Sequence, residues 1–162
     1  MKLVDLASAT VGATLLTALV FTAPQAGADP VRGACTGGTI TWNGNGGNID
    51  LGGDITGCSG HGPITAARLR GKMTSGNCAT TSGQNDMYLD WSDGQTSHLV
   101  GTYATPPNGF SDNTLPVVDG LGAGQKVHVV AQYNFTNPST WGFCFGTPNS
   151  GTAQVLGASF VS

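Results

Sequence analysis

Apolar and polar residues alternate with a period of two over several stretches of the chain, which is the pattern of a β-strand with one buried face. The clearest stretch is 126–134, where Val127, Val129, Ala131 and Tyr133 fall on one side and polar residues on the other. No stretch beyond the first 28 residues shows a helical period. The pattern therefore predicts an all-β protein.

The first 28 residues have the layout of a secretory signal peptide. Lys2 precedes an apolar run from Val11 to Phe21, and a cluster of small residues ends at Ala28. The run is shorter than the roughly 20 apolar residues that a membrane span needs. We expect cleavage after Ala28, secretion of residues 29–162 as one domain, and no membrane association afterwards. Asp5 is unusual in a leading region, and a retained anchor is the alternative.

The stretch from Ala34 to Cys58 predicts a β-hairpin. Gly46 and Gly47 suit the centre of a two-residue turn, because glycine readily adopts the positive φ angles that this turn requires. The resulting register pairs Trp42 with Leu51, Ile40 with Gly53, Gly38 with Ile55 and Cys35 with Cys58. The last pair predicts a disulfide at the open end of the hairpin. An exported chain with four cysteines favours two disulfides, so Cys78 would then pair with Cys144.

A strand is expected over residues 64–75. Its outward residues are Arg68, Arg70 and Lys72, and its inward residues are Ala67, Leu69, Gly71 and Met73. The cations either pair with Asp50 and Asp54 of the preceding strand or protect a sheet edge from association. A ladder that binds an anionic ligand is the other interpretation.

A second hairpin is expected over residues 86–105, with Ser92, Asp93 and Gly94 as its loop and Gly94 in the left-handed conformation. The register pairs Trp91 with Gln95, Leu89 with Ser97 and Met87 with Leu99, and it leaves Tyr88, Asp90, Thr96 and His98 on the opposite face. This register separates apolar from polar residues better than a two-residue turn would.

The remaining stretches complete the fold prediction. Residues 78–85 are expected to form a polar loop, and 114–118 an edge strand because it contains Pro116. Short strands are also expected over 141–145 and 152–160. Seven to nine short strands separated by turns favour a single antiparallel β-sandwich, Ig-like or jelly-roll-like, over a barrel.

Composition narrows the classes of function. The chain has 26 glycines, 9% charged residues and a formal net charge of −3. Nucleic-acid binding is not expected, because it usually needs a strongly basic patch. We also expect no cofactor and a monomeric protein.

Two sets of residues are candidates for chemistry or binding. Trp141, Phe143 and Phe145 share one face of their strand, and they would either join the core or form an exposed contact surface for a glycan or protein. Asp90 lies beside His98 in the predicted register, where a surface ion pair is the commoner outcome. The three histidines do not have the spacing of a zinc site, so we expect neither a metal nor enzymatic activity.

Several short motifs together resemble a group of small secreted all-β proteins of actinobacteria. The motifs are Cys35-Thr36-Gly37 followed by alternating Thr and Ile, the Gly57-Cys58 pair, Cys78, and the run from Trp91 to Ser97. The resemblance covers residues 35–101. It implies export, an all-β fold and disulfides, and it assigns no catalytic residue.

Three hypotheses for function follow. The first is a non-enzymatic extracellular domain that binds a cell-wall component, glycan or protein. The second is a small secreted hydrolase that uses Asp90 and His98. The third is a protease-inhibitor-like or antigen-like protein whose contact is the loop over 105–114.

Overall fold

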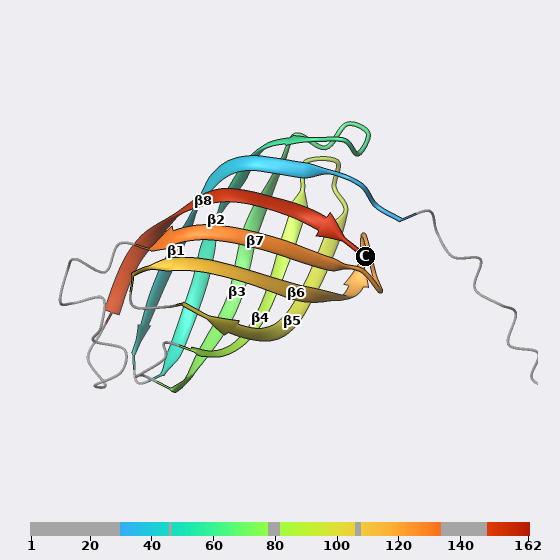
Figure 1. Cartoon of the computed structure of the whole chain (residues 1–162). Helices are drawn as coiled ribbons and strands as arrows, with labels where there is room; N and C mark the ends of the chain where they lie inside the picture. The colour runs from blue at the N-terminus through green and yellow to red at the C-terminus, as the bar shows by residue number, and fades with distance from the viewer. Residues whose placement is uncertain (1–29, 46, 78–81, 106–107, 134–148) are drawn as a thin grey trace, which may run out of the picture.

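The protein is a closed barrel of eight antiparallel strands in the computed structural model, which describes residues 30–45, 47–77, 82–105, 108–133 and 149–162 (Figure 1). The strands are β1 (Ala34–Asn45), β2 (Asn48–Ser59), β3 (Ala66–Asn77), β4 (Ser82–Trp91), β5 (Thr96–Ala104), β6 (Phe110–Gly120), β7 (Lys126–Tyr133) and β8 (Asn149–Val161). No described residues form a helix with the length and apolar character that a membrane crossing needs.

Each strand pairs with the next one along the chain, and β8 returns to pair with β1. The prediction of a β-sandwich is therefore wrong, although the all-β class and the number of strands are right. Each sheet of a sandwich keeps free edges, whereas here β1 and β8 pair along their length, from Ala34 opposite Ser159 to Gly44 opposite Asn149. Pairing between β1 and β8 removes both free edges.

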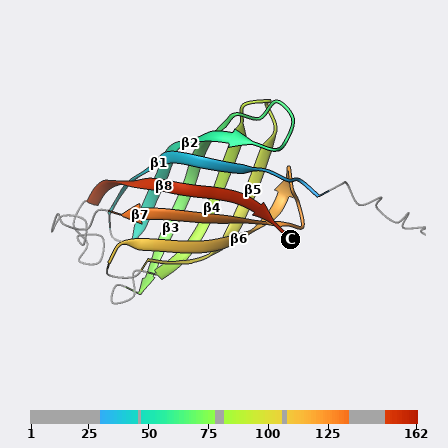
Figure 2. The same cartoon turned by 45° about the horizontal axis from the view of Figure 1, so that its top comes forward.

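The meander gives the barrel two distinct ends. The odd-numbered strands run from the end that carries Cys35 and Cys58, and the even-numbered strands return to it. We call this the disulfide end and the opposite one the polar end. The described chain begins and ends at the disulfide end, where β8 finishes beside the start of β1 (Figure 2).

The β1–β2 hairpin has the predicted register. Trp42 lies opposite Leu51, Ile40 opposite Gly53, Gly38 opposite Ile55 and Cys35 opposite Cys58. Gly47 has a φ of 88°, as the turn requires. Gly53 also needs to be glycine, because it has a φ of 144° and a Cβ there would overlap the carbonyl oxygen of Thr39.

The β4–β5 hairpin also has the predicted register. Leu89 lies opposite Ser97 and Met87 opposite Leu99. The Trp91 amide donates to the Gln95 carbonyl at 2.8 Å, and Gly94 has a φ of 88°. The prediction of a polar loop over 78–85 is wrong for its second half, since β4 begins at Ser82.

Strand β6 is not the predicted edge strand, because it pairs with both β5 and β7. Its pairing with β5 extends only from Gly120 opposite Ser97 to Val117 opposite Leu99. Pro116 follows at the point where the pairing stops, and proline has no N–H to donate to the neighbouring strand. Proline is thus tolerated in a closed barrel where one strand interface is interrupted.

Apolar side chains fill the barrel interior. The inward residues of β3 are those predicted, with Ala67, Leu69 and Met73 buried and the cations outside. The largest fully buried apolar side chains are Ile49, Ile55, Leu99, Leu115, Val127 and Val155. Burying each such side chain stabilises the fold by roughly 1.5–3 kcal/mol relative to exposure.

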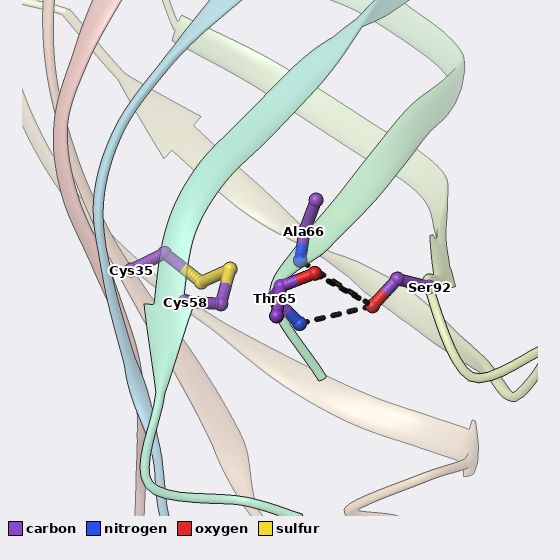
Figure 3. Close-up of a disulfide and its surroundings, with 5 residues drawn as sticks. All are labelled: Cys35, Cys58, Thr65, Ala66 and Ser92. Atoms are coloured by element: carbon purple, nitrogen blue, oxygen red, sulfur yellow. Dashed lines mark hydrogen bonds between the residues drawn. A yellow bond between two sulfur atoms is a disulfide. The ribbon is translucent and has the colours of Figure 1, made fainter. Parts of the chain in front are cut away.

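A disulfide and a group of hydrogen bonds link strands at the disulfide end (Figure 3). The predicted Cys35–Cys58 disulfide is present. Beside it, Ser92 Oγ accepts from the Thr65 amide at 2.9 Å and the Ala66 amide at 3.4 Å, which ties the β4–β5 turn to the start of β3. The second predicted disulfide, between Cys78 and Cys144, lies outside the described residues.

Candidate functional site

Buried polar groups are divided unequally between the two ends of the barrel. At the disulfide end, Ser97 accepts from Trp91 Nε1 at 2.8 Å and donates to the Leu121 carbonyl at 2.6 Å. The other buried polar residues of the described chain are Asn85, Thr105 and Ser111, and all three belong to the polar end. The polar end is therefore the region where the interior offers groups for recognition.

The side chain of Asn113 organises the β5–β6 interface at the polar end. Its Oδ1 accepts from the Ala104 amide at 2.9 Å, and its Nδ2 donates to the Ala104 carbonyl at 3.1 Å. Nδ2 also donates to Ser111 Oγ. Because the amide side chain replaces two missing backbone hydrogen bonds, it holds the two strands together beyond Pro116.

Asn85 points into the barrel from β4. The residue is only 7% exposed, and its Oδ1 has no hydrogen-bond partner within the described part of the chain. It lines a cavity of about 40 Å³, which we call the inner cavity. The described residues that line it with Asn85 include Ile55, Tyr103, Ser111, Asn113, Leu115 and Val129.

A larger and more open pocket of about 440 Å³ lies where β4 begins and β5 ends. We call it the rim pocket. Its lining residues are Ser82, Gly83, Gln84, Thr102, Tyr103, Ala104 and Asn113. These residues carry hydroxyl and amide groups and one aromatic ring but no charge, which suits an uncharged polar ligand.

Two aromatic side chains pack together at the same end. Trp42 of β1 and Tyr133 of β7 have ring centroids 5.4 Å apart and planes inclined at 38°. Burial raises the pKa of the Tyr133 phenol to about 12, because the charged phenolate loses hydration there.

The predicted candidates Asp90 and His98 lie on the outer surface and have different partners. The Arg70 guanidinium donates two hydrogen bonds to Asp90, at 2.7 and 3.1 Å, and Thr96 Oγ1 donates a third at 3.1 Å. The hydrogen bond from Arg70 is the main reason that the pKa of Asp90 lies below its usual value. His98 Nε2 instead lies 2.8 Å from Asp86 Oδ1.

Stacked side chains connect the Arg70–Asp90 ion pair with the His98–Asp86 hydrogen bond. The Arg70 guanidinium carbon lies 4.4 Å from the centre of the Tyr88 ring, and the His98 ring stacks on Tyr88 with centroids 4.3 Å apart. Arg70, Tyr88 and His98 thus form one row across β3, β4 and β5. Arg70 and His98 each have a carboxylate partner, so the row acts first as a cross-strand support for the sheet.

The other predicted candidates are placed as follows. Trp141, Phe143 and Phe145 lie outside the described residues. His61, His98 and His128 do not gather, and no group of three or more His, Cys, Asp or Glu in the described ranges could hold a metal ion. The predicted contact loop over 105–114 is shorter than expected, since β6 already begins at Phe110.

Sequence reasoning missed Asn85 and the rim pocket. The polar composition of residues 78–85 predicts a loop, and a loop prediction assigns no inward or outward face to Asn85. The sequence does contain a signal for this direction. Asn85, Met87 and Leu89 follow one another at a spacing of two residues, so on one strand they point to the same face.

Comparisons with protein-family models, with curated proteins and with solved structures gave no match.

Proposed function

We propose that the protein is a secreted, non-enzymatic binding domain that holds an uncharged polar ligand in the rim pocket, with a sugar unit of an extracellular glycan as the best fit. The observation that carries the proposal is the rim pocket itself, which is about 440 Å³ in volume and lined by neutral hydroxyl and amide side chains. Small-ligand sites commonly have volumes of roughly 300–1,000 Å³ and occur at the mouths of β-barrels.

The chemistry of the lining supports a glycan over a charged ligand. Ser82, Gln84 and Thr102 can each donate and accept hydrogen bonds, as sugar hydroxyl groups also can. A charged ligand would need a counter-charge, and the described lining residues supply none. Ser97, the buried polar side chain of the disulfide end, already has hydrogen-bond partners, whereas the rim pocket at the polar end presents several hydroxyl and amide groups.

The partners of Asp90 and His98 support a non-enzymatic protein. A hydrolase that used these residues would need them within hydrogen-bond reach of one another or of a shared substrate. Here Asp90 pairs with Arg70, and His98 pairs with Asp86.

A glycan array with the purified protein tests the proposal, using Ala104→Trp as the blocking variant. Ala104 lines the rim pocket and is exposed, and its bonds to Asn113 use only backbone atoms. An indole at this position should fill the pocket and abolish binding while leaving the fold intact.

Val100→Trp is the matched control. Val100 lies on the same strand, is exposed, and does not line the rim pocket. Binding of a glycan that Ala104→Trp abolishes and Val100→Trp preserves would support the proposal. No bound glycan, or equal loss in both variants, would contradict it.

A further inference from the structure

The Asn85 amide oxygen is a buried hydrogen-bond acceptor that faces the inner cavity. It has no partner within the described residues. In folded proteins such a buried acceptor is normally satisfied by protein, by ordered water or by a bound molecule. Because Asn85 also lines the inner cavity, a hydrogen-bond donor held in this space is the fitting partner for its amide oxygen.

The size of the inner cavity limits what it can hold. Its volume of about 40 Å³ is roughly three times that needed for one water molecule, and it is well below the approximately 150 Å³ of a cavity that binds benzene. A hydroxymethyl or carboxamide group fits this space, whereas an aromatic or sugar ring does not.

The walls of the inner cavity determine the charge of its occupant. Ile55, Leu115 and Val129 contribute apolar surface, and no described lining residue carries a charge. An anion would face the negative end of the Asn85 amide dipole, and a cation would lose hydration without gaining a carboxylate partner. The occupant must therefore be neutral and must donate a hydrogen bond.

The inner cavity and the rim pocket adjoin one another. Tyr103 and Asn113 line both. We propose that the inner cavity is a subsite that receives an uncharged, hydrogen-bond-donating head group, a hydroxyl or an amide N–H, from the molecule held in the rim pocket. This subsite rests on the proposed function and specifies the class of ligand.

Three small probes of nearly equal size and shape test the subsite. Acetamide is neutral and donates, acetone is neutral and cannot donate, and acetate is an anion that cannot donate. We expect acetamide to cause saturating NMR shifts of the Leu115 and Val129 methyl groups, with a dissociation constant on the order of 10 mM for so few atoms. Acetone should bind roughly tenfold more weakly, because it leaves Asn85 unsatisfied, and acetate should not bind.

Asn85→Leu is the variant that removes the acceptor while keeping a similar side-chain shape. It should reduce acetamide binding to the level of acetone. Asn43→Leu is the control, because it makes the same chemical change at an exposed residue that lines neither pocket, and it should keep the preference for acetamide at the two methyl groups. If Asn85→Leu does not fold, the three probes on the unmodified protein still decide the question.

The results separate this subsite from the proposed function. Equal binding of acetamide and acetone, or no shift of the two methyl groups with acetamide, would overturn the subsite. The glycan array with Ala104→Trp has its own readout, so a glycan held in the rim pocket would still support the proposed function after that result. If acetamide shifts the two methyl signals but no glycan binds, the inner cavity is still specific for a hydrogen-bond donor. Only the proposed glycan ligand of the rim pocket is then excluded.

Discussion

The row of Arg70, Tyr88 and His98 shows how register decides the partners of individual side chains. Tyr88 lies directly opposite both Arg70 and His98 on the neighbouring strands, so the three side chains stack. Asp90 lies opposite Thr96, and its nearest ionic partner is the diagonal Arg70. His98 forms its hydrogen bond with Asp86 instead of Asp90. Asp90 and His98 therefore do not form a catalytic pair on this outer surface.

Removing Arg70 should raise the pKa of Asp90. Arg70→Met deletes the hydrogen bonds that are the largest cause of the lowered pKa. Titration of the Asp90 carboxyl carbon by NMR measures this pKa directly. Arg68→Met is the control, because Arg68 acts on Asp90 only through a smaller coulombic effect, and it should raise the pKa less. A larger shift in Arg68→Met would show that the hydrogen bonds are not the main cause.

Burial of Tyr133 should make the fold sensitive to alkaline pH. Its pKa is about 12 in the folded protein and 10 ordinarily, so the folded state holds this proton more tightly. The associated stability is fully present below pH 10 and is lost as the pH rises toward 12, by up to about 3 kcal/mol. Urea unfolding across this range should show a steeper loss for the unmodified protein than for Tyr133→Phe. Parallel curves for the two proteins would contradict the assignment.

At the scale of elements, the β5–β6 interface depends on a side chain. Backbone pairing ends at Leu99 and Val117, and Asn113 joins the strands again at Ala104. Asn113→Ala should lower the free energy of unfolding by about 1–3 kcal/mol, because it removes both hydrogen bonds to Ala104. Urea unfolding measures the change. Thr114→Ala is the control on an exposed neighbour, and an equal effect in both variants would contradict a special role for Asn113.

The two hairpins could be predicted because several local signals agree on each register. In β1–β2, the glycine turn, the alternation and the cysteine positions all require the same pairing, and a slip by one residue would break all three. At the start of β4 the local signals do not agree on one structure. Ser82 to Asn85 are polar residues that turns also use, so composition favoured a loop, and the most informative residue of the candidate site was assigned to it.

At the scale of the whole molecule, closure of the barrel could not be predicted from local patterns. The same hairpins and the same alternation build a sandwich or a barrel, since each fixes only the pairing of neighbours in sequence. The deciding contact is between β1 and β8, at opposite ends of the described chain. No turn joins these strands, and the short strands separated by turns, on which the prediction of a sandwich rested, carry no signal for this pairing.

The disulfide lies at one end of the barrel, and the rim pocket lies at the other. Cys35 and Cys58 are 23 residues apart, and a link of this length stabilises a fold by about 3 kcal/mol in the chain-entropy model. Replacing both cysteines with serine should lower the free energy of unfolding by about this amount. Urea unfolding of the purified variant measures the loss.

Ligand binding gives the sharper test of this division between the ends. The wall of the inner cavity extends to Ala158, which lies opposite Cys35. Asn85 and the rim pocket nevertheless lie toward the opposite end of β4 and β5, and neither cysteine lines either pocket. A folded double-serine variant should therefore bind acetamide with the affinity of the unmodified protein under conditions where both are native. Weaker binding, with stability reduced as expected, would show that the disulfide also shapes the site, because local loosening at one end would then reach the other through the continuous strands.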